Sequence, residues 1–101
     1  MSEVIVVAAI TAKPGMRDQV EVLARDVAID ATHREEGCMT YALHRDVRNH
    51  DRVVFIERWT TQEALDAHLQ MPHLKEFIAA VGPLAVGPPD LYVLEACEYG
   101  E

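Results

Sequence analysis

The side chains best suited to chemistry are a tryptophan and a histidine at a predicted junction between a strand and a helix. Trp59, the only tryptophan of the chain, ends an apolar run, and His68 lies in the segment that follows. His68 shares one helical face with Leu65 and Leu69, so its imidazole is expected to point toward the apolar interior. An imidazole titrates near neutral pH and can accept a proton from a bound molecule. A histidine that faces inward near an inward tryptophan is therefore the first candidate for a catalytic residue.

The junction itself carries a helix start signal. Thr60 and Glu63 are spaced as a capping box, in which each side chain accepts a hydrogen bond from the backbone N–H of the other residue. The sequence thus predicts a helix over residues 61–70, directly after a strand over residues 52–59. Pro72 suits the first position of a helix, which predicts a further short helix after it.

Alternation within the strand decides which side chains meet the helix. Strand side chains point to opposite faces in turn, so Phe55, Glu57 and Trp59 share one face, and the helix would bring His68 over it. A cavity is therefore predicted between sheet and helix, with walls formed by Tyr41, Phe55, Trp59, Leu65 and His68, and with Glu57 beneath them. Apolar walls with a few polar groups suit a planar aromatic molecule.

The wider pattern predicts one α+β domain over residues 1–101, with a ferredoxin-like βαββαβ order and a four-stranded antiparallel sheet. Apolar, β-rich runs predict the strands, and apolar residues at 3.6-residue spacing predict the helices. The predicted strands are residues 4–11, 38–45, 52–59 and 91–97, and the predicted helices are residues 16–36, 61–70 and 72–81.

The predicted strands are apolar on both faces, although the helices can cover only one. In the first strand Val6 and Ile10 alternate with Ile5 and Val7, and all four are hydrophobic. A solvated sheet face would carry polar side chains instead, and an exposed apolar face of this size usually marks an interface. We therefore expect a homodimer joined through the open faces of two sheets.

Composition disfavours several classes of function. The net charge of −8, from 17 acidic and 9 basic residues, disfavours nucleic acid as a partner, because phosphate binding needs clustered Lys and Arg. The apolar runs are too short for a membrane helix, so a soluble, cytoplasmic protein is expected. Cys38 and Cys97 are expected to be buried fillers. The sequence contains no metal-ligand spacing and no glycine-rich nucleotide motif, so it predicts neither a metal site nor a cofactor.

Four segments form a wider pattern, namely Arg34-Glu35-Glu36-Gly37-Cys38, Glu57-x-Trp59, Ala67-His68-Leu69 and Pro72-His73-Leu74-Lys75. In order and spacing they resemble the antibiotic biosynthesis monooxygenase family, and particularly its quinol monooxygenase-like members. The resemblance implies a dimeric α+β barrel that oxidises a quinol or polyphenol with dioxygen and without a cofactor. It implies catalytic roles for His68 and Trp59, and substrate-binding roles for Phe55, Glu57, Tyr41, Leu65 and His73.

Other functions remain open at the level of sequence. The same histidine could serve an isomerase of a small carbonyl compound, or the protein could be a non-catalytic dimer that binds a hydrophobic ligand or supports a stress response. His68 could also have a purely structural role, hydrogen-bonded to Glu57 or to a backbone carbonyl. Haem-degrading members of the family rely on other residue types at the places of Ala8 and His68, which disfavours haem as a cofactor.

Overall fold

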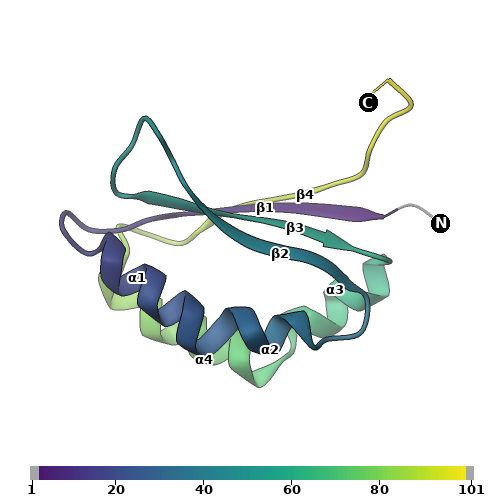
Figure 1. The fold of residues 1–101 in the computed structure, drawn as a ribbon, viewed down its shortest axis with the longest axis horizontal. Helices are drawn as coiled ribbons and strands as arrows, with labels where there is room; N and C mark the ends of the chain where they lie inside the picture. Colours follow the sequence, from purple (N-terminus) through teal and green to yellow (C-terminus); the bar gives the residue numbers. More distant parts are fainter. Residues whose placement is uncertain (1–2, 100–101) are drawn as a thin grey trace.

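The computed structural model describes residues 3–99 and has a four-stranded antiparallel sheet with the helices packed on one face (Figure 1). The strand order is β2-β3-β1-β4, which is the ferredoxin-like arrangement that the sequence predicts. The elements are β1 (Val4–Thr11), α1 (Arg17–Leu23), η1 (Ala24–Ile29), α2 (Asp30–His33), β2 (Cys38–Arg45), β3 (Arg52–Trp59), α3 (Gln62–Leu69), α4 (Pro72–Val81), η2 (Gly82–Leu84) and β4 (Asp90–Leu94).

The first helical run is continuous from α1 to α2, and its middle part, η1, is a π-helix. Four fully buried residues along it, Val20, Ala24, Ala28 and Thr32, follow one another at intervals of four. An ordinary α-helix would rotate such a row away from the sheet, whereas the wider π turns keep it aligned. Small side chains in this row let the helix backbone approach the sheet closely.

The predicted helix end at Glu36, with Gly37 as the stop, is wrong, because α2 already ends at His33 and Gly37 belongs to the turn before β2. Gly37 has a φ of 85°, which favours glycine. A Cβ atom there would lie 2.5 Å from the Cβ of Ala64 on α3, so the turn also needs glycine for space. The turn before β2 is therefore pressed against the start of α3, which fixes the residues around it relative to that helix.

The alternation predicted for the strands is confirmed. On β3 the side chains of Phe55, Glu57 and Trp59 are buried toward the helices, while Ile56 and Arg58 on the other face are exposed. The buried row of β3 lies beside the buried row of β1, since Glu57 pairs with Val6 in the antiparallel register. The sheet therefore presents one continuous wall to the helices.

Three further local predictions need correction. The capping box of Thr60 and Glu63 is wrong, since the N-cap of α3 is Thr61, whose hydroxyl accepts a hydrogen bond of 3.1 Å from the N–H of Ala64. The N–H of Thr60, which Glu63 would have to bind, donates instead to the carbonyl of Gly37. β4 ends at Leu94, three residues short of the predicted end. Cys97 follows this shorter strand and is exposed, so it is no buried filler, whereas Cys38 is half-buried.

The face of the sheet opposite the helices is apolar and carries no cover within residues 3–99 (Figure 1). Its exposed hydrophobic side chains include Ile56 on β3 and Tyr92 and Leu94 on β4. The homodimer predicted from this pattern stays a prediction. No helix within the described residues is long and apolar enough to cross a membrane.

Candidate active site

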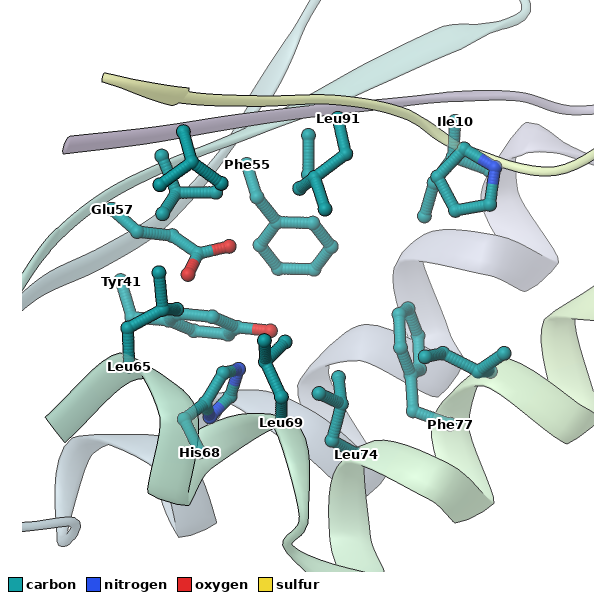
Figure 2. Close-up of a pocket in the computed structure, with 15 residues that line it drawn as sticks. Ile10, Tyr41, Phe55, Glu57, Leu65, His68, Leu69, Leu74, Phe77 and Leu91 are labelled. Atoms are coloured by element: carbon teal, nitrogen blue, oxygen red, sulfur yellow. The ribbon is translucent and has the colours of Figure 1, made fainter. Parts of the chain in front are cut away.

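A cavity of about 240 Å³ lies between the sheet and the two helices α3 and α4 (Figure 2). Engineered apolar cavities of roughly 150 Å³ hold a benzene molecule, so this cavity has room for one substituted aromatic ring. Leu91 and Val93 of β4 line it yet remain about half exposed, so this strand forms an open side. The lining residues are Val6, Ala8, Ile10, Tyr41, Phe55, Glu57, Leu65, His68, Leu69, Leu74, Phe77, Ile78, Pro89, Leu91 and Val93.

Most of the predicted wall residues line this cavity, and two predicted site residues do not. Tyr41, Phe55, Glu57, Leu65 and His68 are all among the lining residues. Trp59 is fully buried behind His68, with the centroids of the two rings 4.6 Å apart. His73 is also absent from the lining, and its ring centroid lies 6.3 Å from that of His68, so neither Trp59 nor His73 forms part of the cavity wall.

Glu57 supplies a buried carboxyl group to the cavity wall. Its Oε1 accepts a hydrogen bond of 3.0 Å from the indole Nε1–H of Trp59, two residues further along the same strand face. Burial raises the pKa of Glu57 to about 7, and the indole hydrogen bond opposes this shift. Near neutral pH the group is therefore divided between an acid that can donate a hydrogen bond and a carboxylate that can only accept one.

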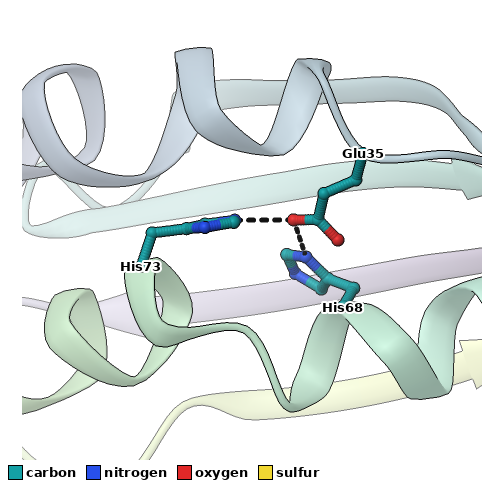
Figure 3. Close-up of side chains that lie close together, drawn as sticks. All are labelled: Glu35, His68 and His73. Carbon is teal, nitrogen blue, oxygen red and sulfur yellow. Dashed lines mark hydrogen bonds and ion pairs between the residues drawn. The ribbon is translucent and has the colours of Figure 1, made fainter.

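His68 is held by the carboxylate of Glu35, a residue that no sequence pattern connects with it (Figure 3). Its Nδ1 lies 2.8 Å from Oε2 of Glu35, and the Nε2 of His73 lies 2.6 Å from the same oxygen. Glu35 comes from the turn after α2, His68 from the last turn of α3 and His73 from the first turn of α4. Three separate elements therefore converge on one carboxylate oxygen.

This contact decides which nitrogen of His68 is free. A carboxylate oxygen accepts hydrogen bonds, so Nδ1 of the neutral imidazole carries the proton and Nε2 keeps a lone pair. Burial lowers the pKa of His68, and the hydrogen bond to Glu35 opposes that shift. The imidazole is thus neutral at pH 7 and lines an apolar cavity, which is the state that a general base requires.

The structure excludes the alternative in which His68 is bonded to Glu57, because the two groups have different partners. Glu35 belongs to one of the four segments that carried the family resemblance, yet no periodicity connects it to His68. The sequence places His68 and His73 close together, one on each side of the predicted helix start at Pro72. This spacing could indicate that the two imidazoles lie near each other in the fold, but it does not identify Glu35 as the residue between them.

Residues 3–80 match the model of the family described as "Antibiotic biosynthesis monooxygenase". The chain is 34% identical over 93 residues to "Putative monooxygenase Rv0793" of Mycobacterium tuberculosis, covering 92% of this chain and 90% of that protein. The solved structure of Rv0793 superposes with a TM-score of 0.87 at 31% identity, covering 96% of this chain and 97% of that chain.

Two further curated proteins are similar to this chain over most of its length. "Probable quinol monooxygenase YgiN" of Escherichia coli is 36% identical over 85 residues, covering 75% of this chain and 82% of that protein. "Uncharacterized protein sll1783" of Synechocystis is 26% identical over 95 residues, and the chain spans only 64% of its length. The matched residues include β1, β2, β3, α3 and all of α4 except Val81, and they contain the whole Glu35, His68 and His73 cluster. By this match the chain belongs to the antibiotic biosynthesis monooxygenase family.

Proposed function

We propose that the protein is a cofactor-independent monooxygenase that oxidises a quinol or a related polyphenol with dioxygen. The observation that carries this proposal is a neutral imidazole, held by a buried carboxylate, in the wall of an apolar cavity large enough for an aromatic ring. The name of the Escherichia coli relative, a quinol monooxygenase, supports the same substrate class. Apolar walls give affinity for such a ring, and the polar groups at one end fix its orientation.

In this proposal the chemical step begins with proton transfer. Nε2 of His68 removes the proton of a phenolic hydroxyl, and Glu35 stabilises the imidazolium that forms through the hydrogen bond to Nδ1. The resulting phenolate is electron-rich and transfers an electron to dioxygen, after which the two radicals combine. One oxygen atom stays on the ring and the other leaves as water, so a quinol and dioxygen give a hydroxyquinone and water.

Glu57 and Trp59 have supporting roles in this scheme. The protonated form of Glu57 can donate a hydrogen bond to the second oxygen of a quinol and hold the ring in place. Trp59 acts through its neighbours, because its indole fixes the carboxyl group of Glu57 and its ring packs against His68. The catalytic role predicted for Trp59 becomes a positioning role, and His73 likewise acts through Glu35.

The predicted homodimer fits this function as part of the same proposal. A second copy packed on the open sheet face would cover the apolar side chains of Ile56, Tyr92 and Leu94. It would also lie next to β4, the strand that forms the open side of the cavity. Excluding water at this side would protect a phenolate and a radical pair from side reactions.

Oxygen consumption tests the proposed function. Purified protein is mixed with a panel of hydroquinones and polyphenols in an oxygen electrode, and the products are identified by mass spectrometry. We expect oxygen uptake with at least one quinol and incorporation of one atom from labelled dioxygen. A separate assay contains small carbonyl compounds in place of the quinols, and their conversion without oxygen uptake would favour the isomerase. Binding of aromatic ligands with no conversion would favour the non-catalytic protein.

A further inference from the structure

We propose that Glu35, His68 and His73 form a binding site for a divalent ion of the zinc type, and that a bound ion switches off the base. The sequence predicted no metal site, because none of its histidines has a ligand spacing with a neighbour along the chain. The fold creates the set instead, by bringing one carboxylate and two imidazoles from three elements together (Figure 3). The proposed function does not require this site.

The geometry of the three groups is close to that of a metal site. One ligand atom of each residue lies within 4.8 Å of the others, and each imidazole nitrogen lies less than 3 Å from Oε2 of Glu35. Zinc bonds to nitrogen and oxygen measure about 2.0 to 2.2 Å, which places tetrahedral ligands about 3.4 Å apart. From their present contacts of 2.8 and 2.6 Å with Oε2, the two imidazole nitrogens would have to move away from the carboxylate by roughly 0.6 and 0.8 Å, a change that side-chain rotation can supply.

A second observation supports a cation at this place. The side chain of Glu35 is only 6% exposed, and its buried Oε1 has no hydrogen-bond partner among the described residues. Within residues 3–99 its ion-pair partners are the two histidines alone, with no Lys or Arg. A buried carboxylate with an unpaired oxygen is costly, and a divalent ion would satisfy both of its oxygens.

The donor set also selects the class of ion. Two imidazoles and one carboxylate suit zinc and its neighbours in the first transition row, whereas magnesium and calcium prefer oxygen ligands alone. Three protein ligands leave a fourth position for water. His73 is 20% exposed and forms the side from which an ion could enter, whereas His68 is buried.

A bound ion would change the tautomer of His68. Coordination through Nδ1 displaces the proton from that nitrogen, so the neutral ring must carry its proton on Nε2, the nitrogen available to the cavity. A protonated Nε2 cannot accept a proton from a phenol. This inhibitory half of the proposal rests on the proposed function, whereas metal binding itself does not.

Binding is tested on the full chain after treatment with a chelator, with Co²⁺ as a spectroscopic probe and Zn²⁺ in calorimetry. We expect one ion per chain, visible absorption typical of tetrahedral Co²⁺, and displacement of Co²⁺ by Zn²⁺. His73→Gln and Glu35→Gln should each weaken Zn²⁺ binding by more than the roughly 10- to 100-fold that loss of an outer-shell partner costs, because each removes a direct ligand. The matched control is His50→Gln, which removes an exposed histidine in the loop between β2 and β3, outside the cluster and outside the open sheet face, and should bind as the parent does.

Trp59 provides an independent readout, because its ring lies 4.6 Å from that of His68. Co²⁺ should quench the fluorescence of this single tryptophan in the parent and in His50→Gln, but not in His73→Gln. Circular dichroism checks that each variant is folded. Absence of a stoichiometric ion, or equal Zn²⁺ affinity in His73→Gln and the parent, would overturn the site.

Oxygen uptake with a quinol then tests the inhibitory half. Zn²⁺ should inhibit the parent in proportion to site occupancy, and the turnover that His73→Gln retains, at whatever level, should resist the same concentration. Full activity of the parent with the site filled would refute the switch while leaving the binding result intact. If no quinol is oxidised at all, the Co²⁺ spectra still decide whether the ion site exists.

Discussion

The two faces of the sheet have similar apolar content but opposite environments. The face toward the helices is buried and includes every polar group of the candidate site that comes from a strand, above all Glu57. The other face carries Ile56, Tyr92 and Leu94 in exposed positions and has no cover within the described chain. Apolar content alone therefore does not identify an active site. The candidate site is identified by buried polar groups that are hydrogen-bonded to one another, such as Glu57 with Trp59 and His68 with Glu35, and these lie on the helix side of the sheet.

Replacement of His68 by alanine should have the largest effect on the helix-covered face. General-base catalysis typically contributes 10²- to 10⁴-fold, so His68→Ala should lower kcat for a quinol by that range. The same substitution should leave near-normal circular dichroism. It removes the buried imidazole, and the carboxylate of Glu35 keeps its contact with His73. Steady-state oxygen uptake measures the effect, with His50→Ala as a control on an exposed histidine of the loop between β2 and β3. Parent-like turnover in His68→Ala would end its assignment as the base.

The pH dependence of turnover should sharpen this result. Because burial lowers the pKa of His68, activity should fall only when the pH drops below the ordinary imidazole value of about 6.5. If protonated Glu57 orients the quinol, activity should also fall as the pH rises past about 7, the pKa of that carboxyl group. Glu57→Gln, which cannot ionise, should then lose the alkaline limb and keep the acid limb.

Substitutions of Trp59 separate its contribution to the packing of the helix-covered face from its contribution to substrate binding. Its ring is fully buried, so Trp59→Ala should lower the free energy of unfolding by about 3 to 5 kcal/mol. Trp59→Phe keeps most of the apolar volume but removes the indole donor to Glu57, and should mainly weaken substrate binding. Urea denaturation of both variants, together with KM values for the quinol, separates the two effects. An equal loss of stability in both variants would show that the indole hydrogen bond, rather than ring volume, dominates.

Glu57 makes a smaller contribution to stability, and its sign depends on pH. Its pKa is raised in the folded state from 4.5 to about 7, so ionisation opposes folding increasingly as the pH rises between these values. Relative to the parent, Glu57→Gln should therefore gain stability between pH 4.5 and 7, by up to about 3 kcal/mol. Denaturation curves at pH 4, 6 and 8 measure this trend. A pH-independent difference between the two proteins would contradict the raised pKa.

The comparison of the faces also explains what the sequence could predict. Strand alternation and helix periodicity are local, so the wall formed by Phe55, Glu57 and Leu65 was predictable, and so was the open apolar face. The hydrogen bond between Trp59 and Glu57 was missed although the two residues share a strand face. Glu35 was missed for a different reason: it is 33 positions from His68, and only the folded chain brings them together.

The open face should respond least to substitution within one subunit and most in the assembly. Ile56 is 39% exposed in a central strand, so Ile56→Asp should lower the free energy of unfolding of an isolated subunit by only about 1 kcal/mol, the span of the strand propensity scale. In the proposed dimer the same aspartate would be buried without a partner at a cost of several kcal/mol, so the variant should be monomeric at concentrations where the parent is dimeric. Val22→Asp on α1 is the matched control, because Val22 is 45% exposed on the helical side. Light scattering of the three proteins over a range of micromolar concentrations measures the assembly. A monomeric parent, or a dimer that tolerates Ile56→Asp but not Val22→Asp, would show that the apolar face is not the interface.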